Sequence, residues 1–167
     1  DYNYGPSFTQ ANQIGADCMH NEGYRGQNMM IAMIDAGFQQ VNVNPVFDSL
    51  RNEGRLLGTR DYVAGNTSVY EDNSHGANCL SLMAGNTPGQ LIGTAPKSQY
   101  WLIRSEDAAT EKIIEENNWV VAAEFADSVG VDITTTSLGY TTFDIASQNH
   151  VYAHLNGKTS VASIAST

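Results

Sequence analysis

One uninterrupted apolar run limits what this chain can fold into. Residues 29–34 read Met-Met-Ile-Ala-Met-Ile, and Asp35, Ala36 and Gly37 follow directly. A short continuous run of this kind, closed by a glycine, is typical of a strand that is buried on both faces of a parallel sheet. Because ligands and catalytic groups gather at the carboxyl ends of such strands, Asp35 stands at a functional position. The alternative is an aspartate that only begins a turn.

The rest of the chain alternates predicted helices with predicted strands. Apolar patterning predicts further strands over residues 55–63, 99–104 and 131–136, and helices over 9–20, 45–51, 75–85, 115–130 and from 159 onward. A polar loop is expected over residues 141–158. This alternation predicts an α/β fold, a three-layer αβα sandwich around a mostly parallel sheet. The 167 residues fit one domain.

Charge and cysteine content narrow the classes of partner. The formal net charge is -10, with 8 Lys plus Arg against 18 Asp plus Glu, which argues against nucleic acid and anionic membranes as partners. No apolar stretch approaches the roughly 18 residues of a membrane span, and no signal peptide is recognisable. Cys18 and Cys79 fit neither a metal-binding spacing nor a disulfide framework, so they are expected to be either a pair or two free thiols.

The position of Asp35 suggests a functional role for a second residue, His75. His75 opens the predicted helix over residues 75–85, a position where a lone histidine is usually a helix-end or surface residue. An imidazole that acts as a general base needs a carboxylate to hold its tautomer and to stabilise the imidazolium. An aspartate at a strand end, earlier in the chain, can supply that carboxylate.

Four motifs, in the same order, resemble those of the subtilisin-like serine peptidases, or subtilases. Residues 31–37 (Ile-Ala-Met-Ile-Asp-Ala-Gly) resemble the segment around the family's catalytic aspartate, and residues 75–79 (His-Gly-Ala-Asn-Cys) resemble its His-Gly-Thr motif. Residues 93–96 (Gly-Thr-Ala-Pro) resemble its Gly-x-Ala-Pro turn, and residues 131–139 resemble its Asp-Val-Ile-x-x-Ser-Leu-Gly stretch. Three positions depart from the usual Ser or Thr, Thr and Asn of the family: Ala36, Ala77 and Thr135.

The resemblance implies a serine endopeptidase that acts on peptide or protein substrates through an acyl-enzyme. It makes Asp35 the orienting carboxylate and His75 the general base, in the chain order Asp, His, Ser. Ser137, Leu138 and Gly139 would line the primary specificity pocket and pair their backbone with the substrate. The resemblance also implies secretion. Many subtilases bind calcium, but no calcium loop is recognisable here, and neither a metal ligand nor another cofactor is predicted.

The motif that would supply the nucleophile is absent. Neither a Gly-Thr-Ser-x-Ala nor an Ala-Gly-Asn sequence follows Gly139, and Ser160, Ser163 and Ser166 match neither motif. Residues 1–167 are therefore interpreted as the N-terminal portion of a truncated subtilisin-like domain, which needs the missing part for activity. The open sheet edge is expected to be completed by a second chain from the same precursor or by self-association.

The loop after the predicted strand 99–104 is acidic. Glu106, Asp107 and Glu111 are expected near the substrate groove, where they would favour basic residues of a peptide. In a chain with this net charge, a solvated acidic face is the favoured interpretation of the three carboxylates.

Two other functions stay open. The changes at Ala36, Ala77 and Thr135 would also fit a catalytically inactive member of the fold that is kept for peptide binding or assembly. A nucleotide-binding or receiver-type domain would use Asp35 as a metal or phosphate site. It is disfavoured because no glycine-rich phosphate loop follows the strand at residues 29–34.

Overall fold

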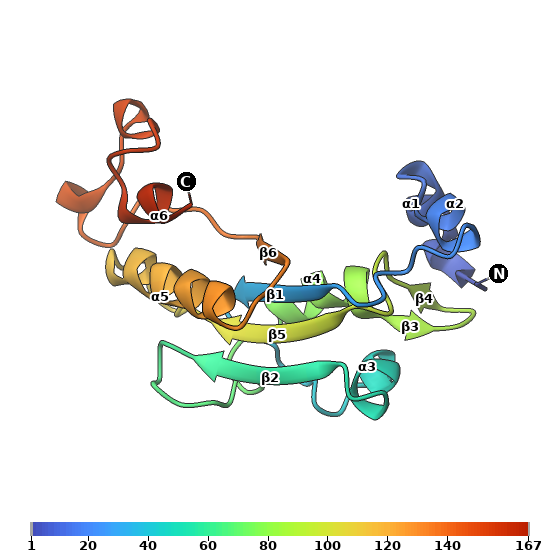
Figure 1. The fold of residues 1–167 in the computed structure, drawn as a ribbon. Coiled ribbons are helices and arrows are strands. Elements are labelled where there is room, and N and C mark those ends of the chain that lie inside the picture. Colours follow the sequence, from blue (N-terminus) through green and yellow to red (C-terminus); the bar gives the residue numbers. More distant parts are fainter. Residues whose placement is uncertain (1, 167) are drawn as a thin grey trace.

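The computed structural model describes residues 2–166 of the chain. Its centre is a sheet of four parallel strands in the order β2-β5-β1-β6. The strands are Met30–Asp35 (β1), Leu56–Asp61 (β2), Gln99–Arg104 (β5) and Ile133–Thr136 (β6). The arrowheads of β1, β2 and β5 point to the same end of the sheet (Figure 1), so the residues that follow these strands meet there.

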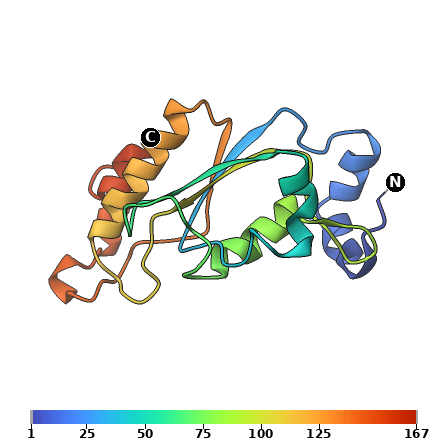
Figure 2. The same cartoon turned by 90° about the horizontal axis from the view of Figure 1, so that it is seen from below.

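Helices cover both faces of this sheet. One face carries η2 (Pro45–Phe47), α3 (Asp48–Asn52) and α4 (His75–Ala84), and the other carries α5 (Ile114–Ser128), against which α6 (Val161–Ala165) packs. Figure 2 shows α4 and α5 on opposite sides of the strands. The three-layer α/β sandwich predicted from the sequence is confirmed.

The alternation of side chains along β1 divides the core between the two faces. Ile31 and Met33 belong to the cluster on the α4 side, and Ala32 and Ile34 belong to the cluster on the α5 side. All four side chains are at most 5% exposed, so β1 is buried on both faces, as its unbroken apolar run predicts.

The N-terminal segment differs from the single helix expected over residues 9–20. It forms η1 (Gly5–Ser7), α1 (Phe8–Gln13) and α2 (Ala16–Asn21). Gly15 separates the two α-helices because its φ of 73° lies in the left-handed region, which no residue of a right-handed helix adopts.

Short elements appear where only turns or a loop were expected. Strands β3 (Asn86–Thr87) and β4 (Leu91–Ile92) pair antiparallel, and the 3-10 turns η3 (Ala146–Gln148) and η4 (Tyr152–His154) interrupt the segment over residues 141–158. These elements span only two or three residues each, too few to give a periodic signal in the sequence.

Two further expectations are settled by the structure. Cys18 and Cys79 are both free thiols, so the disulfide alternative is wrong. Among the helices of residues 2–166, none has the length and apolar character that a membrane crossing requires.

Candidate active site

Asp35 is the last residue of β1, and its side chain is buried (1% exposed). Its Oδ1 accepts a hydrogen bond of 2.7 Å from the Ala36 backbone N–H. The chain then turns at Gly37, where φ is 150° and a Cβ atom would lie 2.8 Å from the backbone nitrogen of Asn73. Only glycine permits this close passage, so the chain leaves the strand abruptly and the carboxylate stays at the strand end.

His75 begins α4, and its imidazole reaches the carboxylate of Asp35. The distance between His75 Nδ1 and Asp35 Oδ1 is 2.8 Å, and the histidine side chain is 51% exposed. The backbone N–H of His75 donates to Oδ1 of Asn73 at 2.8 Å, which fixes the start of the helix. When Nδ1–H donates to Asp35, Nε2 keeps its lone pair, and no residue among 2–166 forms a hydrogen bond with Nε2.

Gly76 lets the first turn of α4 approach the end of β1. A Cβ atom at this position would lie 2.5 Å from the carbonyl oxygen of Gly37 and 2.9 Å from the Cβ of Asp35. Both neighbours are held by the backbone, so neither can yield without moving the strand end. The contact between His75 and Asp35 therefore depends on a residue without a side chain.

Replacing Gly76 with alanine should separate the helix from the strand end. We expect a loss of about 1–3 kcal/mol in the free energy of unfolding, because the added methyl group overpacks a contact between backbones. Urea denaturation measures this loss. Gly139→Ala is the matched control for stability, since a Cβ at that position meets no atom within 4 Å. Equal midpoints for the two variants would contradict the steric argument.

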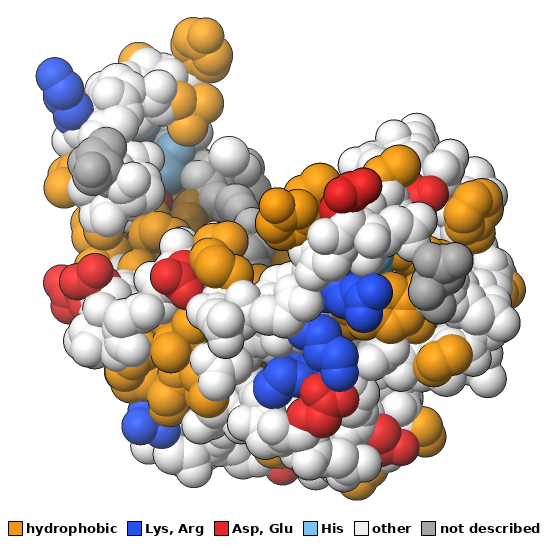
Figure 3. Space-filling model, turned by 45° about the vertical axis from the view of Figure 1, so that its right-hand side comes forward, with side chains coloured by type: hydrophobic (Ala, Val, Ile, Leu, Met, Phe, Trp, Pro, Cys, Tyr) orange, Lys and Arg blue, Asp and Glu red, His pale blue; other side chains and the backbone are white. Residues whose placement is uncertain are grey.

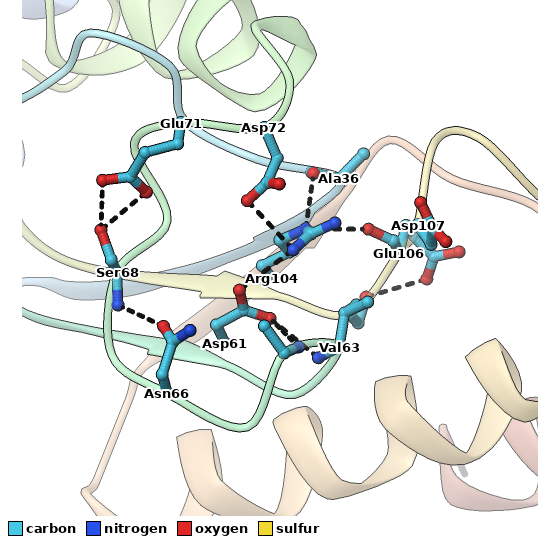
Figure 4. Close-up of polar contacts among 12 residues, drawn as sticks. Ala36, Asp61, Val63, Asn66, Ser68, Glu71, Asp72, Arg104, Glu106 and Asp107 are labelled. Atoms are coloured by element: carbon cyan, nitrogen blue, oxygen red, sulfur yellow. Dashed lines mark hydrogen bonds and ion pairs between the residues drawn. The ribbon is translucent and has the colours of Figure 1, made fainter.

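A buried arginine holds the segments around this site together (Figure 4). Arg104 is the last residue of β5, and its Nη1 lies 3.0 Å from a carboxylate oxygen of Asp61 and 3.0 Å from one of Asp72. Its Nε donates to the carbonyl oxygens of Ala36 and Glu106, at 3.2 Å each. One side chain thus connects the ends of β2 and β5 with the loops that follow β1, β2 and β5.

A pocket of about 380 Å³ opens beside His75. The three residues predicted to bind substrate, Ser137, Leu138 and Gly139, form part of its wall, and the loop over residues 106–111 forms another part. The structure therefore brings Asp35, His75 and the segment 137–139 to one place on the molecule, although they come from three separate stretches of sequence.

The acidic loop is only in part the solvated face that the sequence favoured. Glu111 is exposed, but Glu106 is only 7% exposed, and its Oε1 accepts hydrogen bonds from the hydroxyls of Ser105 (2.8 Å) and Tyr140. Burial and the neighbouring Glu106 raise the pKa of Tyr140. The solvated-face interpretation is thus wrong for Glu106, because the loop folds back against α5 and residue 140.

Two residues of the site escape sequence reasoning. Cys79 lies one turn after His75 on α4, and its sulfur, a ring nitrogen of His75 and a carboxylate oxygen of Asp35 lie within 4.8 Å of one another. The spacing of four residues from His75 was the signal that could have found Cys79. The second residue, Glu115 on α5, is 3% exposed and lines the pocket. Its position in the first turn of a predicted helix indicated a surface carboxylate.

Glu115 should make stability depend on pH. Burial, followed by the negative charge of Glu106, raises its pKa from 4.5 to about 7. Between pH 4.5 and 7, the folded state therefore holds a proton on Glu115 that the unfolded state has released. The contribution of this group to the free energy of unfolding is fully present below pH 4.5 and is lost as the pH rises through 7. Glu115→Gln should gain stability relative to the parent at pH 8 but not at pH 4, as thermal unfolding at both values will measure. A pH-independent difference would contradict the assignment.

No protein-family model matches the chain, but individual subtilisins do. Subtilisin from Bacillus pumilus is 28% identical over 130 residues, covering 76% of this chain and 43% of that protein. Subtilisin E of Bacillus subtilis (strain 168) is 28% identical over 130 residues, covering 76% and 31%. Bacillopeptidase F of the same strain is 30% identical over 129 residues, covering 69% and 9%. The chain thus spans less than half the length of these curated relatives.

Solved structures share the fold at lower identity. MycP1 with its N-terminal propeptide removed superposes with a TM-score of 0.64 at 15% identity, covering 93% of this chain and 43% of that one. The prenylagaramide maturation protease PagA gives a TM-score of 0.56 at 18% identity, covering 77% and 40%. These similarities extend the family evidence from sequence to the arrangement of strands and helices. The chain is a relative of the subtilisins and belongs with the subtilisin-like serine peptidases, of whose catalytic domain it matches a part.

Proposed function

We propose that the natural protein carrying this chain is a serine endopeptidase of the subtilisin type. The observation that carries the proposal is the 2.8 Å contact between the buried carboxylate of Asp35 and the half-exposed imidazole of His75. Such a carboxylate fixes the tautomer and stabilises the imidazolium that forms when Nε2 takes a proton from a serine hydroxyl. His75 then returns this proton to the leaving amine as the peptide bond breaks.

The nucleophile and the oxyanion donor are assigned to a part of the domain outside this chain. Within residues 2–166, no serine hydroxyl forms a hydrogen bond with His75. Ser160 instead caps α6, where its Oγ accepts from the backbone N–H of Ser163 at 3.1 Å, and Ser166 donates to the carbonyl of Ser163. We therefore expect that this chain alone does not hydrolyse peptides at an enzymatic rate, because it has a base but no group to activate.

The substrate is proposed to lie along residues 137–139. Ser137 and Gly139 are exposed beside the pocket that contains His75, and the position of a Cβ on Gly139 is open space. An extended peptide can pair with exposed backbone of this kind as an added strand, which presents its carbonyl carbons to the catalytic groups. Backbone pairing holds peptides of many sequences, so selectivity must come from the pockets.

A further part of the same domain is the proposed partner at the sheet edge. In the described sheet, β6 pairs only with β1, and Ile133 on β6 is 48% exposed. Figure 3 shows a hollow between the C-terminal segment at the upper left and the N-terminal segment at the right, with hydrophobic side chains at its margins. A continuation of the chain, a second chain from the same precursor or a second copy would cover this edge. Intact and native mass spectrometry of the natural protein distinguishes these arrangements.

We further propose an extracellular location, as for a secreted subtilisin.

Labelling by a fluorophosphonate tests the proposed function. The reagent forms a bond only with a serine whose hydroxyl is activated, so the natural protein should be labelled and His75→Ala should not. A protein that binds peptides but takes no label would be the catalytically inactive member of the fold. That outcome would refute the peptidase proposal and leave the fold assignment unchanged.

A further inference from the structure

We propose that the pocket beside His75 selects a positively charged side chain, arginine or lysine, of the peptide substrate through the buried carboxylates of Glu115 and Glu106. This inference rests on the proposed function and adds the class of substrate. Its evidence is one unpaired buried oxygen, the charges of the pocket wall and the position of the pocket relative to residues 137–139.

The unpaired oxygen belongs to Glu115. Glu115 is only 3% exposed and lines the pocket. Its Oε1 has no hydrogen-bond partner among the described residues. A buried carboxylate oxygen without a donor is costly, because it has lost water and gained nothing in return. A guanidinium or ammonium group entering the pocket would supply the missing donor as a charge-assisted hydrogen bond.

The charges of the pocket wall have one sign. Glu106, Asp107 and Glu111 line the pocket together with Glu115, and neither lysine nor arginine is among its lining residues. The nearby guanidinium of Arg104 is already paired with two carboxylates and two backbone carbonyls. The wall therefore holds four carboxylates and neither lysine nor arginine, and an incoming cation would relieve the repulsion from Glu106, which adds to burial in raising the pKa of Glu115.

The position of the pocket indicates a peptide side chain rather than a metal ion. Ser137, Leu138 and Gly139 line the same pocket, so a peptide paired with them would place a side chain between that segment and the loop over residues 106–111. Among the described residues, the one group of three side chains close enough to share a metal ion is Asp35 with His75 and Cys79, which does not include the acidic wall.

The test compares arginine with citrulline, which has nearly the same shape but no charge. The natural protein is given fluorogenic peptides that carry one or the other at each position in turn. At one position, arginine should raise kcat/KM by roughly 10- to 100-fold, the range expected of a desolvated charge-assisted hydrogen bond. Glu115→Gln should bring the ratio of arginine to citrulline close to one.

The matched control is Glu124→Gln, which removes the same charge from an exposed position on the same helix. It should leave both the ratio and the activity unchanged. If Glu115→Gln does not fold, Glu111→Gln at the exposed rim serves instead and should lower the ratio by a smaller factor. Equal rates for arginine and citrulline at every position, or a ratio that the tested variant leaves intact, would overturn the inference.

The two proposals fail in different ways. Hydrolysis without any preference for arginine would refute the acidic pocket and leave the peptidase standing. If no peptide is hydrolysed, the peptidase proposal fails. Calorimetric binding of the same peptides then tests whether the pocket selects a positively charged side chain. Tighter binding of the arginine peptide that Glu115→Gln abolishes supports the pocket, and equal binding of the two peptides overturns it.

Discussion

Replacing His75 with alanine should lower kcat for peptide hydrolysis by the natural protein by about 10⁶-fold, because the residues of the proposed triad act together and losing the general base removes nearly all of their effect. Asp35→Asn should cost about 10⁴-fold, because an amide at that position favours the wrong tautomer of the imidazole while leaving the geometry intact. Steady-state kinetics on one fluorogenic peptide measures both losses.

His154→Ala is the control for the loss of a histidine, since His154 lies in η4 and does not line the pocket. It should keep full activity. Substantial hydrolysis by His75→Ala, after purification that excludes contaminating peptidases, would contradict the role assigned to the Asp35–His75 pair.

Arg104→Met should lower the free energy of unfolding by about 3–5 kcal/mol, the cost of breaking a buried ion pair by removing one partner. Asp61 is 3% exposed and would keep a buried charge without a counter-ion. The carbonyl oxygens of Ala36 and Glu106 would lose a shared donor at the same time. Because these carbonyls belong to the loops that flank the pocket, the proposed peptidase activity should also fall.

Chemical denaturation of Arg104→Met, compared with Lys112→Met at an exposed position nearby in sequence, measures the loss of stability. Adding Asp61→Asn to Arg104→Met should recover part of the loss, because the second change removes the stranded charge. A loss below 1 kcal/mol for Arg104→Met would show that the network in Figure 4 contributes little to the fold.

The layers of the fold could be predicted because a strand buried on both faces is apolar at every position, a pattern that can be recognised in the sequence. The strand β1 is apolar without interruption, and the helices that cover it carry recurring apolar positions. The order of the motifs also placed Asp35, His75 and residues 137–139 near one another. The break at Gly15 was missed because a pattern of apolar residues does not report the sign of φ.

The buried acids of α5 could not be predicted from local sequence. Glu115 and Glu116 occupy the first turn of a helix, where exposed carboxylates are common. Glu116 is buried because partners far along the chain reach it: its Oε1 contacts Nε2 of His150, and its Oε2 accepts from the backbone N–H of Val161. Contacts across more than thirty residues leave no local signal, and the same holds for the folding of the acidic loop against Tyr140.

The glycine contact between α4 and β1 has a consequence for the proposed peptidase. The strands β1, β2 and β5 and the helix α4 all precede residue 105, so the imidazole can be oriented before later parts of the domain exist. A partly synthesised chain would then hold an oriented general base without the serine that the proposed function requires. If the proposed function is correct, proteolytic activity would begin only when the segment that supplies the serine docks on this part of the domain, so the cell would be exposed to the peptidase only after assembly.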